Sequence, residues 1–99
     1  MEAQVERYCK IYKHDFLDPS KWPGVATDII VHEHAGPIIA VAEQYGSLVA
    51  WLEADTFRPK LDRYFRIVGT GWERPPNNYT HRGTTQIDYF VAHLYERTP

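Results

Sequence analysis

Residues 63–72 read Arg-Tyr-Phe-Arg-Ile-Val-Gly-Thr-Gly-Trp, and this stretch carries the strongest β-strand signal in the chain. Its side chains alternate with a period of two, so Arg63, Phe65 and Ile67 face one side and their neighbours face the other. β-Branched and aromatic residues fill it, as a half-buried strand prefers. The stretch therefore predicts a strand over 62–68 that separates an apolar interior from a positively charged exterior.

The two glycines that follow indicate how this strand ends. Gly69 and Gly71 tolerate positive φ, so they predict a bulge or a sharp exit. A Gly-Thr-Gly segment can also let a phosphate approach the backbone, but phosphate cradles normally open a helix. Here residues 74–78, Arg-Pro-Pro-Asn-Asn, predict an extended loop instead. We therefore favour a structural turn over a phosphate site, and we expect no cofactor.

The rest of the chain alternates between short strand patterns and loops rich in Gly and Pro. We favour a hairpin at residues 45–47 over a helix across 38–54, and we expect the strand at 38–44 to be central because it is apolar on both faces. The predicted strands are residues 4–14, 25–34, 38–44, 48–54, 62–68, 84–87 and 89–96.

This pattern predicts one all-β domain over residues 1–99. The expected fold is a small antiparallel β-sandwich or barrel of about six to eight strands, with little or no helix. Residues 1–24 form its N-terminal part, an edge strand followed by a Pro-rich loop. A helix over 4–14 is the weaker alternative.

Composition narrows the class of protein. The 99 residues carry a net charge of −2, which argues against a general nucleic-acid binder. No apolar run approaches the roughly 20 residues of a membrane span, and the N-terminus has no signal-peptide pattern. The single cysteine, Cys9, cannot form an internal disulfide. Together these features predict a cytoplasmic location without membrane association.

Charge is unevenly distributed along the chain. Residues 1–55 hold 4 Lys/Arg against 9 Asp/Glu, whereas residues 56–82 hold 6 Lys/Arg against 2 Asp/Glu. A basic middle segment on a mildly acidic protein can receive an anion. Solubilising charge on exposed strands and loops explains the same pattern, and we favour that simpler interpretation.

Arginine and aromatic residues gather in this basic segment. Tyr64 and Arg66 share one strand face, and His81 accompanies further candidates on the predicted loops beyond. Such residues anchor protein interfaces, stack on nucleobases and grip phosphates. The alternative is that Tyr64 packs across strands while the arginines are only solvated. The candidate ligand- or partner-binding residues are Arg63, Tyr64, Arg66, Trp72, Arg74, Tyr79 and Arg82.

The histidines are weaker candidates. His32 and His34 project to one side of a predicted strand, a spacing that metal sites use, and His93 is a conceivable third ligand. The cupin family pairs such a motif with a nearby glutamate, but Ile38 and Ile39 stand at that place here. We therefore favour packed or surface histidines. Nucleophile motifs are missing as well, so a non-enzymatic role is expected.

Four segments are similar to a family of short uncharacterised proteins encoded in tailed-phage and prophage genomes. They are residues 44–55, 65–71, 83–86 and 90–96, and the second, Phe-Arg-Ile-Val-Gly-Thr-Gly, is the most specific. The resemblance covers about residues 25–96. It implies an all-β fold and a phage origin, and it implies no catalytic residues.

We therefore expect a phage-type accessory protein that acts by binding in the cytoplasm of the infected cell, as a homo-oligomer. Its partner would be a host protein or a small anionic ligand, for example a nucleotide signal of host defence. Two alternatives remain at this point. The first is a virion or assembly component, and the second is a His-based metal-dependent enzyme.

Overall fold

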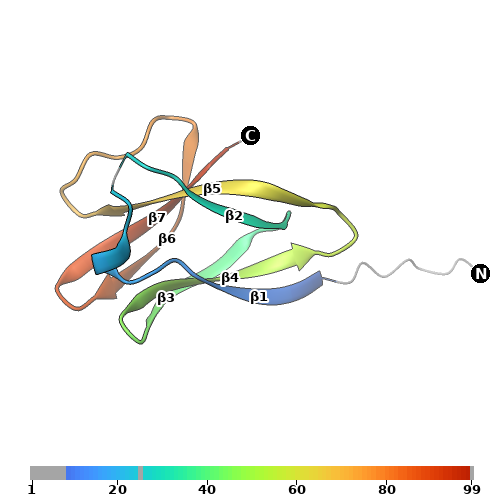
Figure 1. Ribbon diagram of the computed structural model, residues 1–99, viewed down its shortest axis with the longest axis horizontal. Helices are drawn as coiled ribbons and strands as arrows, with labels where there is room; N and C mark the ends of the chain where they lie inside the picture. The colour runs from blue at the N-terminus through green and yellow to red at the C-terminus, as the bar shows by residue number, and fades with distance from the viewer. Residues whose placement is uncertain (1–8, 25, 99) are drawn as a thin grey trace, which may run out of the picture.

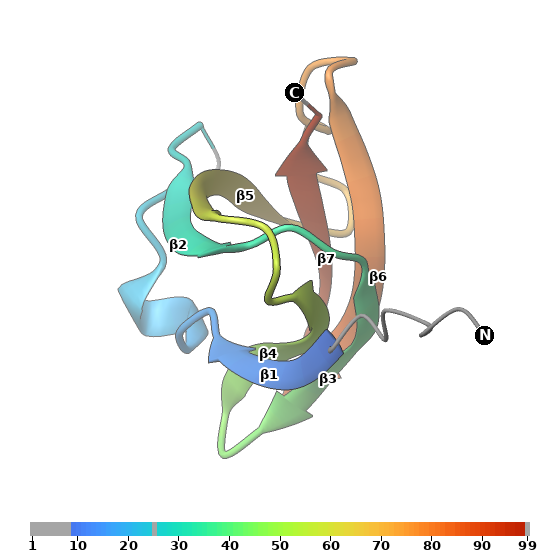
Figure 2. The same ribbon diagram turned by 90° about the vertical axis from the view of Figure 1, so that its right-hand side faces the viewer.

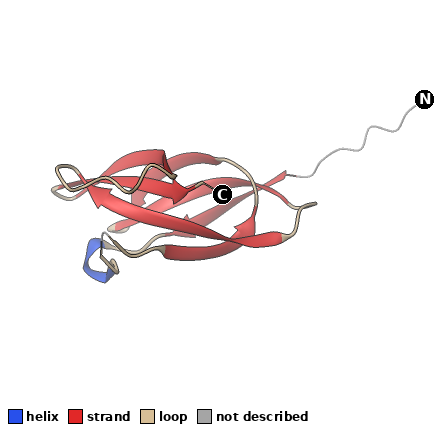
Figure 3. Cartoon of the chain, turned by 90° about the horizontal axis from the view of Figure 1, so that it is seen from above, coloured by secondary structure: helices blue, strands red, loops and turns tan. Residues whose placement is uncertain are grey.

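The computed structural model describes residues 9–24 and 26–98, which form two antiparallel sheets stacked as a sandwich (Figures 1 and 2). Sheet A has the strand order β1-β4-β3, and sheet B has the order β2-β5-β7-β6. One 3-10 turn, η1 (Pro19–Lys21), accompanies the strands (Figure 3), so the prediction of a small all-β fold is confirmed. The strands are β1 (Cys9–Asp15), β2 (Ile29–His34), β3 (Ile38–Gln44), β4 (Ser47–Asp55), β5 (Lys60–Gly69), β6 (Tyr79–Ile87) and β7 (Phe90–Arg97).

The core lies between the two sheets and is filled by the inward-facing side chains of each strand. Phe16, which follows β1, packs edge-on against Phe65 of β5 with ring centroids 4.8 Å apart. Burying one large apolar side chain of this kind contributes about 2 kcal/mol. The buried cluster consists of Phe16, Leu48, Ala50, Phe65, Ile67, Ile87, Ala92 and Leu94.

The prediction that residues 38–44 form a central strand is wrong. β3 is an edge strand of sheet A, and β4 lies at its centre. Ile38 and Val41 pack against the core, but Ile39 and Ala40 are exposed on the other side. Apolar residues on both faces of a strand therefore did not mean burial on both faces.

Two strand boundaries also differ from prediction. β2 begins at Ile29 rather than at residue 25, because residues 26 and 27 form a turn and a bend before it. β6 begins at Tyr79 rather than at residue 84, because its first residues pair with β7. Its first half is polar and lacks an apolar alternation, so the sequence pattern did not predict this part of the strand. Tyr79, His81 and Arg82 are therefore strand residues, not loop residues. Residues 4–8 and 25 of the predicted strands lie outside the described residues.

Sheet B opens at one end. β5 pairs with β2 over residues 60–65, but its pairing with β7 covers only residues 65–69. The end of β7 stays beside β6, where Thr98 N donates to Asn78 O at 2.6 Å. β5 and β7 thus diverge beyond the Phe65–Glu96 pair, as the course of the two strands in Figures 1 and 2 shows. We call this opening, between residues 60–64 of β5 and residues 96–97 of β7, the split.

β6 packs closely against β3 of the other sheet. A Cβ on Gly83 would lie 2.4 Å from Val41 Cγ2, so Gly83→Ala forces Val41 or the nearby backbone to move. We expect a loss of about 1–3 kcal/mol in the free energy of unfolding, measured by urea denaturation. Val41→Ala removes Cγ2 but keeps Cβ, which would lie 2.7 Å from the added atom. It therefore relieves part of the clash, and the double variant should lose less stability than the sum of the two single changes. Simple additivity would contradict this packing.

Candidate functional site

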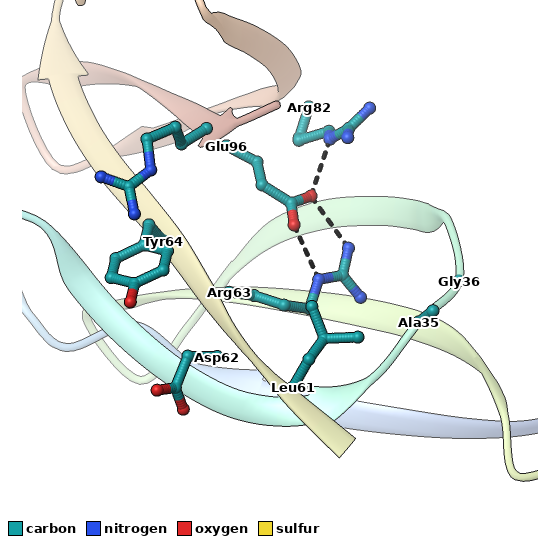
Figure 4. Close-up of a pocket in the computed structure, with 9 residues that line it drawn as sticks. Ala35, Gly36, Leu61, Asp62, Arg63, Tyr64, Arg82 and Glu96 are labelled. Carbon is teal, nitrogen blue, oxygen red and sulfur yellow. Dashed lines mark hydrogen bonds and ion pairs between the residues drawn. The ribbon is translucent and has the colours of Figure 1, made fainter. Parts of the chain in front are cut away.

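The split opens onto a hollow with a volume of about 370 Å³. Four consecutive β5 residues, 61–64, line one side of it, and Arg82, Glu96 and Arg97 line the other. Ala35 and Gly36, from the loop between β2 and β3, lie at its edge (Figure 4). The hollow therefore joins segments from four parts of the chain, and it is bordered by charged groups.

A buried ion pair lies at the point where β5 and β7 part. Arg63 donates from Nε and from one terminal nitrogen to the two carboxylate oxygens of Glu96, at 2.7 and 2.8 Å. Its other terminal nitrogen donates to the carbonyl of His34 at 3.1 Å. Arg63 and Glu96 are each only 6% exposed. Two-point bonding with further hydrogen bonds is the geometry that offsets the desolvation of a buried pair.

A second arginine reaches the same carboxylate. Arg82 Nε donates to Glu96 Oε1 at 2.9 Å, and the terminal nitrogens of its guanidinium point away from Glu96 (Figure 4). A register shift in β6 between His81 and Gly83 places Arg82 at this position. Such bulges re-aim a side chain. Two guanidinium groups thus share one carboxylate, which leaves an excess of positive charge at the hollow.

The walls of the hollow are firmly held. A Cβ on Gly36 would lie 1.9 Å from the carbonyl oxygen of Glu53, and Gly36 has φ +147°, so only glycine fits at this place. Asp55 N donates to the carbonyl of Ala35 at 2.9 Å, which ties the loop to β4. Leu61 is 44% exposed and adds apolar surface.

The outer face of sheet B carries a separate polar network around Asp28. The Asp28 carboxylate accepts from Tyr79 Oη at 2.5 Å and from Arg66 Nε at 3.0 Å, and Arg97 lies 3.8 Å away. Arg66 also lies over the Tyr79 ring, with Cζ 4.6 Å from the centroid. Burial alone would raise the pKa of Asp28, but these hydrogen bonds and charges outweigh it and hold the pKa below its ordinary value. The network ties the turn before β2 to sheet B.

Tyr64 belongs to this outer face and also borders the hollow. The Arg97 guanidinium stacks on its ring, with Cζ 3.7 Å from the centroid. Tyr64 is therefore partly covered by an arginine from its own chain. The stack places a planar, cationic surface at the rim of the split.

The last two predicted binding residues lie elsewhere. Trp72 and Arg74 line a smaller hollow, of about 200 Å³, with residues 68–71 and two β7 side chains. The Trp72 indole also contacts the Phe90 ring edge-on, with centroids 6.3 Å apart. The structure therefore divides the seven candidates among three places. Arg63, Tyr64 and Arg82 border the split, Arg66 and Tyr79 surround Asp28, and Trp72 and Arg74 line the smaller hollow.

The histidines do not converge. His32 is opposite Asp62 on β5 and contacts its carboxylate at 3.0 Å, whereas His93 is opposite Val68, six residues further along β5. At the usual rise of a strand this separation is roughly 20 Å. His34 Nδ1 lies 2.6 Å from the carbonyl of Arg58. Within residues 9–24 and 26–98, no three or more His, Cys, Asp or Glu side chains are grouped as metal ligands.

Sequence reasoning missed the acidic partners that organise the arginines. Glu96 continues the inward alternation of Ala92 and Leu94 on the last strand, and all three are buried. A carboxylate on the inward face of a strand needs a cationic partner, which was a readable signal. Asp28 gave no such signal, because it lies directly before β2 and its partners Arg66 and Tyr79 are distant in sequence.

The model of one protein family matches residues 21–99, and this family is described as a domain of unknown function, DUF7352. The chain belongs to the DUF7352 family. The matched region includes every residue that lines the split, so the hollow is part of the DUF7352 domain. No curated protein and no solved structure matches the chain. The described residues also contain no helix with the length and apolarity of a membrane span.

The buried carboxylate at the split should be essential to the fold. Glu96→Gln leaves two guanidinium groups without their counter-charge, and removing one partner of a buried pair costs about 3–5 kcal/mol. We expect a loss of this order in urea denaturation. Glu53→Gln, at an exposed position on β4, is the matched control and should change stability by less than about 0.5 kcal/mol. If Glu96→Gln lowered the free energy of unfolding no more than Glu53→Gln does, the ion pair at the split would not be needed for stability.

The network around Asp28 predicts a pH dependence. Because the folded pKa lies below the ordinary value of 3.8, ionised Asp28 stabilises the fold above that value. This contribution disappears as the pH falls through the ordinary value and then through the folded one. Asp28→Asn should therefore cost about 2 kcal/mol near pH 7, and the difference from the unmodified protein should shrink below about pH 4. Denaturation at a series of pH values checks this, and a constant difference would contradict it.

Proposed function

We propose that this DUF7352 protein acts by binding rather than by catalysis, and that the split in sheet B receives an anionic group of its ligand. One observation carries the proposal. Arg63 and Arg82 share the single carboxylate of Glu96, so the hollow has one more guanidinium than that carboxylate neutralises. The terminal nitrogens of Arg82 are directed away from Glu96 (Figure 4), so they remain able to donate to a ligand.

The arrangement suits ligand binding because the arginines are fixed in advance. Glu96 holds the Arg82 side chain at one nitrogen, so less side-chain entropy is lost when a ligand contacts the others. The volume of about 370 Å³ falls within the usual range of ligand sites. Leu61 and the Tyr64 ring provide apolar and planar surface beside the charge. A ligand with an anionic group next to an apolar or planar body fits these features.

The biological setting follows from the resemblance of residues 44–55 and 65–71 to tailed-phage and prophage proteins. In that setting the protein is a phage accessory factor in the cytoplasm of the infected cell, acting as a homo-oligomer. Two kinds of target carry the required anionic group. One is a nucleotide signal of host defence, and the other is an acidic segment of a host protein.

The proposal is tested by comparing two arginines. Arg82→Gln keeps a hydrogen-bonding side chain at the split but removes its charge, whereas Arg74→Gln removes a charge at the smaller hollow. The ligands are cyclic mono- and dinucleotides and short acidic peptides, assayed by thermal shift and calorimetry. We expect at least one ligand to bind, with about tenfold weaker affinity in Arg82→Gln and unchanged affinity in Arg74→Gln.

Native mass spectrometry of the freshly purified protein supplies an independent readout, because it reports retained small molecules and the subunit count together. Failure of every anionic ligand to bind would overturn the proposal. Equal weakening by both arginine variants would overturn it as well, because that result indicates a diffuse charge effect rather than a site at the split.

A further inference from the structure

We infer that the ligand of the split is an extended peptide segment of another protein, which adds a strand to the open edge of β5 and places an acidic side chain on Arg82. This inference rests on the proposed function and specifies the class of ligand. It depends on the shape of the hollow, on the free strand edge, and on the alternation of side chains along β5.

The edge of β5 is incomplete at this place. β2 pairs with β5 over residues 60–65, whereas β7 pairs with it only from Phe65 onward. Within the described residues, residues 60–64 therefore have a strand neighbour on one edge only. An unpaired strand edge presents alternating N–H and C=O groups, and another strand satisfies them directly. A nucleotide cannot satisfy such a row of backbone groups.

The hollow follows this edge. Its lining includes the four consecutive residues 61–64, so it runs along the strand rather than into one point of it. On its border lie Ala35 and Gly36, two of the smallest residues, and Gly36 is held against Glu53. The space where β7 would have continued is thus left open by a small-residue loop. Five residues of β5 offer about 17 Å of edge at the usual rise per residue.

The register specifies the peptide. Continuing the antiparallel ladder beyond Phe65 and Glu96 places successive peptide residues opposite Tyr64, Arg63, Asp62 and Leu61. Opposing side chains in a ladder share one face. The residue opposite Arg63 therefore projects inward toward Arg63 and Arg82, and the residue two positions later projects toward Leu61. From N- to C-terminus, the preferred sequence is an acidic residue, any residue, and an apolar residue.

The outer face suits the intervening residue. The peptide residue between the acidic and the apolar one lies opposite Asp62. The peptide residue before the acidic one lies opposite Tyr64, and the Arg97 guanidinium stacks on the Tyr64 ring. Asp62 contacts His32 on the neighbouring strand, and both side chains are exposed, so this part of the face is polar. A threonine or valine is suitable at these outward positions because β-branched residues favour extended backbone.

The test uses a fluorescent peptide, acetyl-Thr-Glu-Val-Leu-Thr-amide, and fluorescence polarisation. The Glu→Gln peptide should bind about tenfold more weakly to the unmodified protein. Arg82→Gln should weaken the Glu peptide by a similar factor but leave the Gln peptide almost unchanged, whereas Arg74→Gln should change neither. This double comparison pairs the peptide carboxylate with Arg82 specifically.

Backbone pairing has its own control. Two versions of the peptide are methylated on alternate backbone nitrogens, so one version blocks the N–H groups that face β5 and the other blocks those that face away. We expect one version to lose at least about tenfold in affinity and the other to bind nearly as well as the parent. Hydrogen exchange by NMR should show added protection among residues 60–64 when the peptide is bound.

The outcomes separate the inference from the proposed function. If both methylated peptides bind as well as the parent, or if a nucleotide binds through Arg82 and the peptide does not, the added strand is ruled out while an anion site at the split stands. If neither peptide nor nucleotide binds, both the inference and the proposed function fail. Loss with one methylated version, together with dependence on Arg82, supports the added strand.

Discussion

The ion pair between Arg63 and Glu96 is the constraint on which the open end of sheet B depends. A sheet that closed fully would continue the β5–β7 ladder past Phe65 and bury apolar side chains there. Instead, charged residues occupy the next inward positions, and they need water or partners nearby. Glu96 satisfies both Arg63 and Arg82, and the end of β7 remains beside β6. The buried ion pair therefore forms where β5 and β7 diverge, and the charged side chains there would not fit a fully paired, apolar end of the sheet.

Burial also decides which arginines can serve a ligand. All three guanidinium nitrogens of Arg63 donate hydrogen bonds, two to Glu96 and one to the carbonyl of His34. Its side chain is almost completely buried. Arg66 is committed to Asp28 and Tyr79. Arg82 is about one third exposed and contacts Glu96 through one nitrogen. Three arginines that look equivalent in the sequence therefore differ in the structure. Arg63 and Arg66 hold the fold together, whereas Arg82 can also contact a ligand.

The sequence predicted the architecture better than it predicted the site. The alternation of residues 62–68 and the glycine at the 45–47 turn determine local backbone geometry, and both appear in the structure as β5 and the β3–β4 hairpin. β3 was predicted to be central but is an edge strand. Its position in the sheet depends on which strands pair, and pairing is a long-range property that the local pattern does not contain. β6 was underestimated because its polar first half is stabilised by pairing with β7 rather than by burial.

The site could not be predicted because its residues meet only through tertiary pairing. Alternation placed Arg63 on the same face as Phe65, which already assigned it to the interior, yet the neighbouring positive charges suggested an exposed basic surface. Its partner Glu96 lies 33 residues away, and the contact exists only because β7 pairs with β5 in the observed register. A shift of one residue would turn Glu96 outward and leave Arg63 buried without a counter-charge.

The same reasoning explains why the open edge of β5 is tolerated. Exposed strand edges promote aggregation unless charges or irregular backbone protect them. Lys60 and Asp62 supply charge along this edge, and Arg82 and Glu96 border it from the far side. Indiscriminate pairing with an apolar strand would leave these charges without solvent or partners. A segment that brings a carboxylate to Arg82 avoids that cost, so the groups that protect the edge would also select what can pair with it.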